Sequence, residues 1–175
     1  MNKKNKGFTL IEFLLYSIIV TATTGALIAI GINIMKVSAK VSVVEEVNYN
    51  GKMIIDEITS SVRESESIVY PSPGVQGEYL TLEMKIDTNN PVGFTKNEIT
   101  ETLIMQTGND LFTTMNSNLT KIGEIKFSNV SYPGSPGTLK IEIDVMYRNL
   151  TGKEEYDFQK TFYTTENLRI KEVSD

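Results

Sequence analysis

Glu12 has the most unusual setting of any ionisable residue in this sequence, because it stands at the start of a long apolar run. No charged residue follows it until Lys36. A carboxylate at membrane depth costs about 2.5–3.5 kcal/mol on insertion scales, and the positive end of its own helix offsets only about 0.3–1 kcal/mol. An ionised Glu12 therefore needs a nearby cation, and its position predicts ion pairing. The alternative is a carboxylate held at the level of lipid headgroups without a function.

Other side chains with catalytic or metal-binding chemistry are scarce. The chain has no Cys, His or Trp, which removes thiolate chemistry, the commonest general base and the commonest metal ligand. The carboxylate pairs Glu64/Glu66 and Glu154/Glu155 are interpreted as solvated surface. Residues 87–90 offer oxygen ligands, but they are too few and too weakly acidic for a dedicated Ca²⁺ loop. We therefore expect no catalytic residue, no metal and no cofactor, and we predict that the protein is not an enzyme.

The element that must position Glu12 is a helix formed by the apolar run. Residues 13–35 are 23 uncharged residues, and as a helix they extend about 35 Å, which is enough to cross a hydrocarbon core. Hydroxylated residues together with Gly25 and Gly31 suit close contact with another helix. Three lysines precede the run, so the N-terminus is expected to stay cytoplasmic while the rest of the chain crosses the membrane.

Two ordinary interpretations of this N-terminal segment remain open. One is a signal-anchor helix with no further role. The other is a removable secretory signal, cleaved after the small residues Val20-Thr21-Ala22. Glu12 interrupts the transition from basic to apolar residues, and the apolar pattern continues to Met35, so both features count against a removable signal.

The stretch Lys6-Gly7-Phe8-Thr9-Leu10-Ile11-Glu12, followed by the apolar run, resembles the N-terminus of type IV pilins and of type II secretion pseudopilins. The match covers roughly residues 1–36. It implies that a membrane prepilin peptidase cuts between Gly7 and Phe8 and then N-methylates Phe8. In this family interpretation the new amine of Phe8 is the missing cation, and Glu12 pairs with that amine on a neighbouring subunit during filament assembly.

The resemblance also implies partners and a location. The expected partners are other pilins or pseudopilins, the prepilin peptidase, the inner-membrane assembly platform and membrane lipid. The chain would be a single-pass protein of the inner membrane that later enters a filament. It lacks the cysteine pair that many major pilins carry, and the layout of residues 57–70, 78–85 and 162–169 resembles J-type minor pseudopilins, which prime or cap a filament tip.

Periodicity divides the rest of the chain into a helix and a β-rich region. The domain expectation is a leader at 1–7, a transmembrane and assembly helix at 8–35, an amphipathic continuation at 36–66 and a β-rich head domain at 67–175. This is an α+β fold, with a long N-terminal helix packed on an antiparallel sheet. The helical stripe predicted to face the interior is Val37, Val41, Val44, Asn48, Gly51, Ile55, Ile58 and Val62.

Alternating apolar residues and turn signals predict the strands of the head domain. Residues 138–148 alternate most clearly, and residues 78–85 place Leu80, Leu82 and Met84 on one face. A hairpin turn at 149–152 would lead into a return strand with Tyr156 and Phe158 on one face, together with Phe162. The expected strands are residues 78–85, 99–106, 111–115, 121–130, 138–148 and 153–164.

The charge balance bears on the choice between functions. The net charge is −5, from 17 basic and 22 acidic residues. Nucleic-acid affinity depends on neutralising phosphates, so this subunit alone is not expected to bind nucleic acid. The alternative to a filament subunit is a membrane-anchored extracytoplasmic module for binding or adhesion that never enters a filament.

Overall fold

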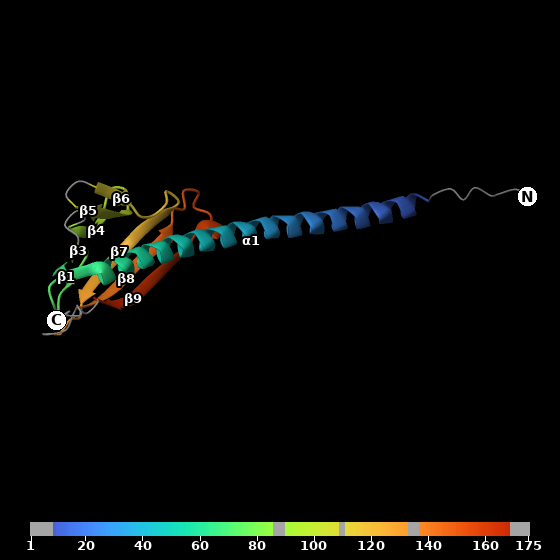
Figure 1. The fold of residues 1–175 in the computed structure, drawn as a ribbon. Helices are drawn as coiled ribbons and strands as arrows, with labels where there is room; N and C mark the ends of the chain where they lie inside the picture. The colour runs from blue at the N-terminus through green and yellow to red at the C-terminus, as the bar shows by residue number, and fades with distance from the viewer. Residues whose placement is uncertain (1–8, 86–89, 109–110, 133–136, 169–175) are drawn as a thin grey trace, which may run out of the picture. The chain divides into compact units, whose positions relative to one another are not determined.

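The computed structural model describes residues 9–85, 90–108, 111–132 and 137–168 (Figure 1). The chain divides into two compact units, residues 1–41 and 42–175, and the helix α1 (Leu10–Glu64) contributes to both. In the second unit, residues 42–64 of α1 pack on antiparallel β-sheets. The predicted α+β architecture is confirmed.

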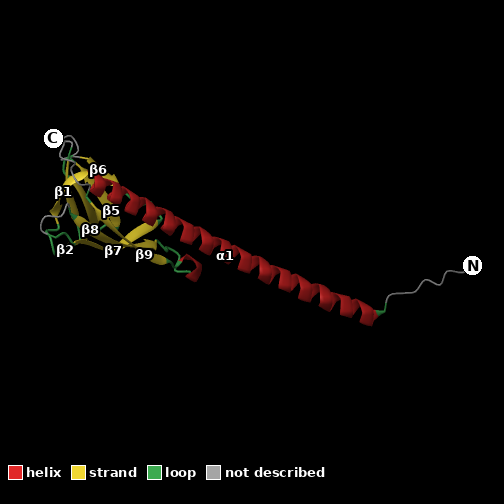
Figure 2. Ribbon diagram, turned by 60° about the horizontal axis from the view of Figure 1, so that its bottom comes forward, coloured by secondary structure: helices red, strands yellow, loops and turns green. Residues whose placement is uncertain are grey.

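Nine described strands follow the helix and form two antiparallel sheets rather than the single sheet expected (Figure 2). The five-stranded sheet has the order β1-β3-β4-β5-β6, and the four-stranded sheet has the order β2-β7-β8-β9. The strands are β1 (Ser65–Tyr70), β2 (Gln76–Gly77), β3 (Leu80–Met84), β4 (Val92–Asn97), β5 (Thr102–Thr107), β6 (Leu111–Thr114), β7 (Thr120–Asn129), β8 (Thr138–Tyr147) and β9 (Gln159–Asn167).

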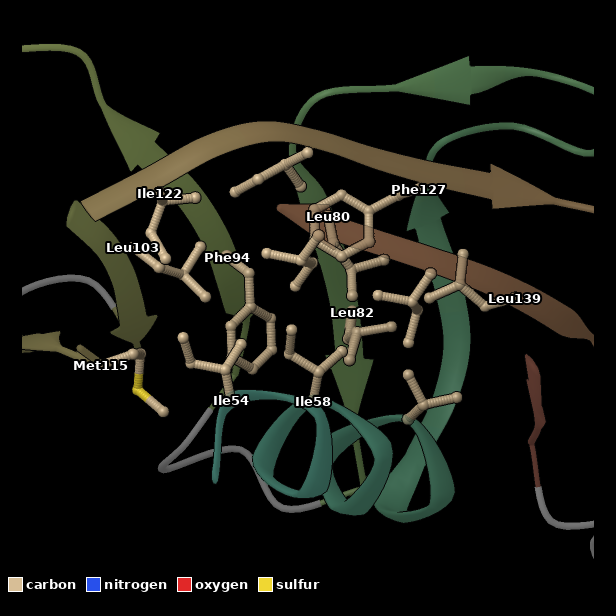
Figure 3. Close-up of a cluster of buried hydrophobic side chains, with 14 of the residues drawn as sticks. Ile54, Ile58, Leu80, Leu82, Phe94, Leu103, Met115, Ile122, Phe127 and Leu139 are labelled. Carbon is tan, nitrogen blue, oxygen red and sulfur yellow. The ribbon is translucent and has the colours of Figure 1, made fainter. Parts of the chain in front are cut away.

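One hydrophobic core joins α1 to both sheets. Ile54 and Ile58 of the helix are fully buried, and Figure 3 shows them pointing toward Leu82 and Phe94 of the five-stranded sheet. Phe127 and Leu139 of the four-stranded sheet belong to the same buried cluster. The predicted alternation is confirmed in β8, where the core-facing residues Leu139, Ile141, Ile143 and Val145 have no exposed surface.

The predicted helical stripe is correct at its end and wrong at its beginning. Val37 and Val41 are exposed, whereas Val43 and Val47, which were not predicted, are buried. Apolar residues occupy adjacent positions here, so two neighbouring stripes both satisfy helical spacing, and only the position of the sheets selects one. The buried residues of α1 are Val43, Val47, Asn50, Gly51, Ile54, Ile58, Ser61 and Val62.

Several strand boundaries differ from the prediction. The helix ends at Glu64 and β1 begins directly at Ser65, inside the range expected to be helical. β4 was not predicted, because its sequence VGFTKN contains a glycine and few β-branched residues. Ile99 lies in a turn with its side chain almost fully exposed, so β5 begins three residues later than expected.

The connection between β8 and β9 contains the predicted turn but is longer than a tight hairpin. The Asn149 Oδ1 accepts hydrogen bonds from the N–H groups of Thr151 at 3.2 Å and Gly152 at 2.8 Å. Gly152 has a φ of 68°, which favours glycine. A short 3₁₀ helix, η2 (Glu154–Tyr156), follows, so Tyr156 lies outside the return strand on which it was expected.

Candidate functional site

Glu12 lies in the first turn of α1 and forms a reciprocal pair with Thr9, the residue that precedes the helix. The Thr9 N–H and hydroxyl both lie 3.4 Å from the Glu12 Oε2, and the Glu12 N–H donates to the Thr9 Oγ1 at 3.3 Å. This arrangement is a capping box, in which a Thr and a Glu three residues later satisfy each other's free backbone donors. The pattern Thr-x-x-Glu is readable in the sequence, but our sequence interpretation did not use it.

The capping box gives Glu12 a role in its own helix besides any role between subunits. Its carboxylate is exposed, and it is held against the backbone at the N-terminal end of α1. The helix starts at Leu10, where unpaired N–H groups create a positive potential that stabilises a carboxylate. Gly7 and Phe8 lie outside the described residues, so cleavage and N-methylation there stay predictions.

The first half of α1 presents apolar residues on every side. By length and composition α1 can cross a membrane, and the apolar residues of its first half are exposed. Leu10, Ile18 and Leu27 each leave more than two thirds of their surface uncovered, and they point in different directions around the helix. Exposed apolar residues all around a helix indicate an apolar surrounding such as lipid. The structure therefore contains one helix that could span a membrane, and its orientation in a membrane stays a prediction.

Hydroxyl groups in this segment are bonded within the helix. The Ser17 hydroxyl donates to the Phe13 carbonyl at 2.9 Å, and the Thr21 hydroxyl donates to the Ser17 carbonyl at 2.8 Å. The Thr23 hydroxyl likewise donates to the Ile19 carbonyl at 2.9 Å. Polar groups in lipid need such internal partners. These hydroxyl groups therefore remain compatible with lipid without the neighbouring helix that their presence suggested in the sequence.

The described surface of the second unit carries polar side chains, but they do not form a cluster of metal ligands. One depression of the second unit, about 460 Å³, is lined mostly by charged residues, and Lys96 pairs there with Glu98 at 3.0 Å. Within the described ranges no three potential metal ligands come together. Of the possible Ca²⁺ loop, residues 87–89 lie outside the described residues, and the Asn90 Oδ1 accepts a hydrogen bond from the Met84 N–H at 3.1 Å.

Carboxyl groups with shifted pKa values in this unit belong to ion pairs. The Glu166 pKa is lowered by its hydrogen bond with Arg63, whose guanidinium lies 2.9 Å away. The Glu142 pKa is lowered by its hydrogen bond with Lys140 at 2.5 Å. A general acid needs a raised pKa, so both shifts have the opposite direction. Of the sequence-predicted carboxylate pairs, Glu64 and Glu66 are both exposed.

A partly buried polar cluster was missed in the sequence and ties the helix to the loop after β6. The Asn50 Oδ1 accepts a hydrogen bond from the Ser117 N–H at 2.8 Å, and the Ser117 hydroxyl donates to Glu46 at 2.6 Å. The Asn50 amide also donates to Glu46 at 2.9 Å. The helical spacing of Glu46 and Asn50 was readable, but their partner Ser117 lies 71 and 67 residues further along the chain, respectively.

Comparisons with known proteins do not extend these observations. No protein-family model matches the chain, and neither the curated proteins nor the solved structures contain a match to it.

Proposed function

We propose that this chain is a structural subunit of a filament of the type IV pilin or type II secretion pseudopilin class, anchored and assembled through its N-terminal helix. The observation that carries the proposal is the position of the Glu12 carboxylate. Its Oε2 lies 3.4 Å from the backbone nitrogen of Thr9, the residue directly after Phe8. Cleavage between Gly7 and Phe8 would create an amine one residue before that nitrogen.

A charged group beside lipid is costly, and Glu12 would lie there. An uncompensated carboxylate there costs about 2.5–3.5 kcal/mol, and the capping box does not remove its charge. A new amine at Phe8 would supply a positive charge at the same end of the helix. In a filament the amine of a neighbouring subunit can meet Glu12 in the same way, so burial of the pair would favour assembly.

The proposal includes a location and a set of partners. The leader 1–7 stays cytoplasmic, the helix crosses the inner membrane once, and the β-rich unit lies outside the cytoplasm. The partners are the prepilin peptidase, the assembly platform, other pilins or pseudopilins and membrane lipid. On the J-type resemblance and the lack of cysteine, we propose a minor subunit that primes or caps the filament tip.

The direct test is the chemical identity of the mature N-terminus. The full chain is produced in cells with an active prepilin peptidase, and its N-terminal peptide is measured by mass spectrometry. We expect N-methylated Phe8 as the first residue, and we expect a Gly7→Val variant to keep its leader. A wild-type chain that retains residues before Gly7 would contradict the proposal and would favour a membrane-anchored binding module.

A second test separates the charge of Glu12 from its capping role. Glu12→Gln keeps an oxygen that can accept the Thr9 bonds but removes the charge, whereas Thr9→Ala removes the cap and keeps the charge. We expect Glu12→Gln to lower recovery of the subunit in sheared filaments about tenfold, which corresponds to about 1.4 kcal/mol. We expect a smaller loss for Thr9→Ala. The reverse order would show that capping, not ion pairing, is the function of Glu12.

A further inference from the structure

The outer edge of the five-stranded sheet is formed by a short strand that is exposed along its whole length. All four residues of β6 are exposed, including Leu111 and Phe112, which each leave about two thirds of their surface uncovered. β6 pairs with β5 on one side, and no described residue pairs with its other side (Figure 1). Alternate residues of β6 therefore present unpaired N–H and C=O groups outward.

One face of β9, the edge strand of the four-stranded sheet, lies against α1. A Cβ placed on Gly51 of the helix would overlap the ring of Phe162, which shows how closely the two elements approach. The Lys160 ammonium donates to the Asn48 Oδ1 at 2.7 Å, and Arg63 pairs with Glu166 at 2.9 Å. The charges of Lys160 and Glu166 on this strand disfavour pairing with another strand.

The remaining edges are blocked by irregularity or by shortness. β1 contains two register shifts within six residues and carries the exposed charge of Glu66. β2 has only two residues. β6 has neither a bulge nor a charge nor a proline, which are the usual devices against edge pairing. Among the described strands, β6 is therefore the edge best suited to accept another strand.

No charged side chain lies on either face of β6. The register puts Phe112 opposite Gln106 and Thr114 opposite Ile104 on the outer face of the sheet. Leu111 and Thr113 lie on the other face, opposite Thr107 and Met105. The outer face of the four-stranded sheet is different, because Lys126 lies opposite Glu142 there. A strand that pairs with β6 would meet no charged side chain on it.

We propose that the free edge of β6 pairs with β6 of a second copy of this chain, antiparallel and related by a two-fold axis, to join two five-stranded sheets. Only an extended strand satisfies the alternating donors and acceptors of such an edge. The chain carries a net charge of −5, so two copies repel each other at long range, whereas LFTT opposite LFTT adds no pair of like charges at the contact. A two-fold interface uses the same patch on both copies.

The expected strength of this contact is modest. A four-residue edge falls short of the roughly 1,000 Å² that a stable interface needs. Two copies held in one membrane raise the effective concentration, so a weak edge contact becomes populated there without new contacts. The pairing does not depend on filament assembly, and it can therefore be tested even if the proposed function fails.

Cysteine scanning of the full chain in its membrane tests the pairing directly, since the native chain has no Cys. Leu111, Phe112, Thr113 and Thr114 are replaced by Cys one at a time, and oxidised dimers are quantified on non-reducing gels. Thr165→Cys, exposed on the outer face of β9, is the control. In an antiparallel pair related by a two-fold axis, a residue lies opposite its own copy only where the axis passes between the strands. We therefore expect one position, or two adjacent ones, roughly tenfold above the control.

A charged variant provides the second measurement. Phe112→Lys, or Leu111→Lys if the maximum falls at Phe112, should return the yield to the control level, while the tyrosine near-UV spectrum stays unchanged. Yields at the control level at all four positions would overturn the proposal. Equal yields at all four would overturn the antiparallel arrangement. A cross-linked product that mass spectrometry assigns to another protein would overturn the choice of a second copy.

Discussion

The two halves of α1 have the same backbone structure but are stabilised by different surroundings. The first half is uncharged and largely apolar around its circumference over residues 13–35, and the hydroxyls of Ser17, Thr21 and Thr23 bond to its own carbonyls. The second half, in residues 42–64, buries one band of residues and carries charges elsewhere. The first half is thus long and apolar enough to cross a membrane, whereas the second half buries its apolar residues against the sheets. Matched substitutions in the two halves should reveal this difference.

The largest difference in the free energy of unfolding between matched substitutions in the two halves is expected for an apolar residue that is buried in the second half. Ile54→Ala removes a side chain with no exposed surface from the core, and such truncations cost about 2–5 kcal/mol in the free energy of unfolding. Ile28→Ala in the first half is the control, because Ile28 is exposed and should change the value by less than about 0.5 kcal/mol. Urea unfolding of the detergent-solubilised chain, followed by tyrosine near-UV signals, measures both. Equal losses of unfolding free energy for the two variants would contradict the difference between the two halves.

Replacing a polar side chain should give a smaller difference in the free energy of unfolding between the two halves. Asn50→Ala leaves the Ser117 N–H without its acceptor in a partly buried place, which costs about 1–3 kcal/mol. Thr21→Val is the control, because the Thr21 hydroxyl bonds only to its own helix at Ser17 and valine has nearly the same shape. The same unfolding measurement applies. A loss at position 21 as large as that at position 50 would show that the first half also depends on specific polar contacts.

Replacing a glycine by alanine should lower the free energy of unfolding in the second half and leave it unchanged in the first. A Cβ at Gly51 would overlap the ring of Phe162, so Gly51→Ala should destabilise by about 1–3 kcal/mol. No described atom lies within 4 Å of a Cβ placed on Gly31, so Gly31→Ala should leave unfolding of the second unit unchanged and raise helicity. Circular dichroism and urea unfolding measure the two effects. The double variant Gly51→Ala/Phe162→Ala should lose less than the sum of its single changes.

The smallest expected effect is the pH dependence of the Arg63–Glu166 pair. The hydrogen bond with Arg63 lowers the Glu166 pKa in the folded chain below its ordinary value of 4.5. This contribution to stability is therefore fully present above about pH 4.5 and is lost as the pH falls through the folded pKa. We expect the stability difference between the wild type and Glu166→Gln to shrink between pH 5 and pH 3, with Glu57→Gln as an exposed control. A difference independent of pH would contradict the pairing.

Features that depend on neighbouring residues could be predicted from the sequence. The alternation of β8 and the turn at Asn149 were predicted correctly, because the residues that define them are close in sequence. The position of Glu12 at the start of the helix was also readable, and so was its Thr9 partner, although only the structure drew attention to it. The cleavage and methylation expected at Gly7 and Phe8 stay predictions.

Features that depend on distant residues were missed or misplaced. The stripe of α1 was predicted one position away from the buried band at Val43 and Val47, since adjacent apolar residues satisfied both patterns. The Asn50–Ser117 contact joins residues 67 positions apart, and no local pattern reports such a pair. The division of the strands into two sheets, with β6 left at an open edge, follows from the same long-range pairing.

The sequence by itself determined the long apolar helix, the carboxylate at its start and the alternating strands. Each of these follows from interactions within a few residues or from transfer between water and an apolar solvent. Only the tertiary structure decided which face of the helix is buried, which polar side chains are paired and which strand edge is left free. Those outcomes depend on contacts between segments far apart in the chain, where several local patterns are equally allowed and packing selects one.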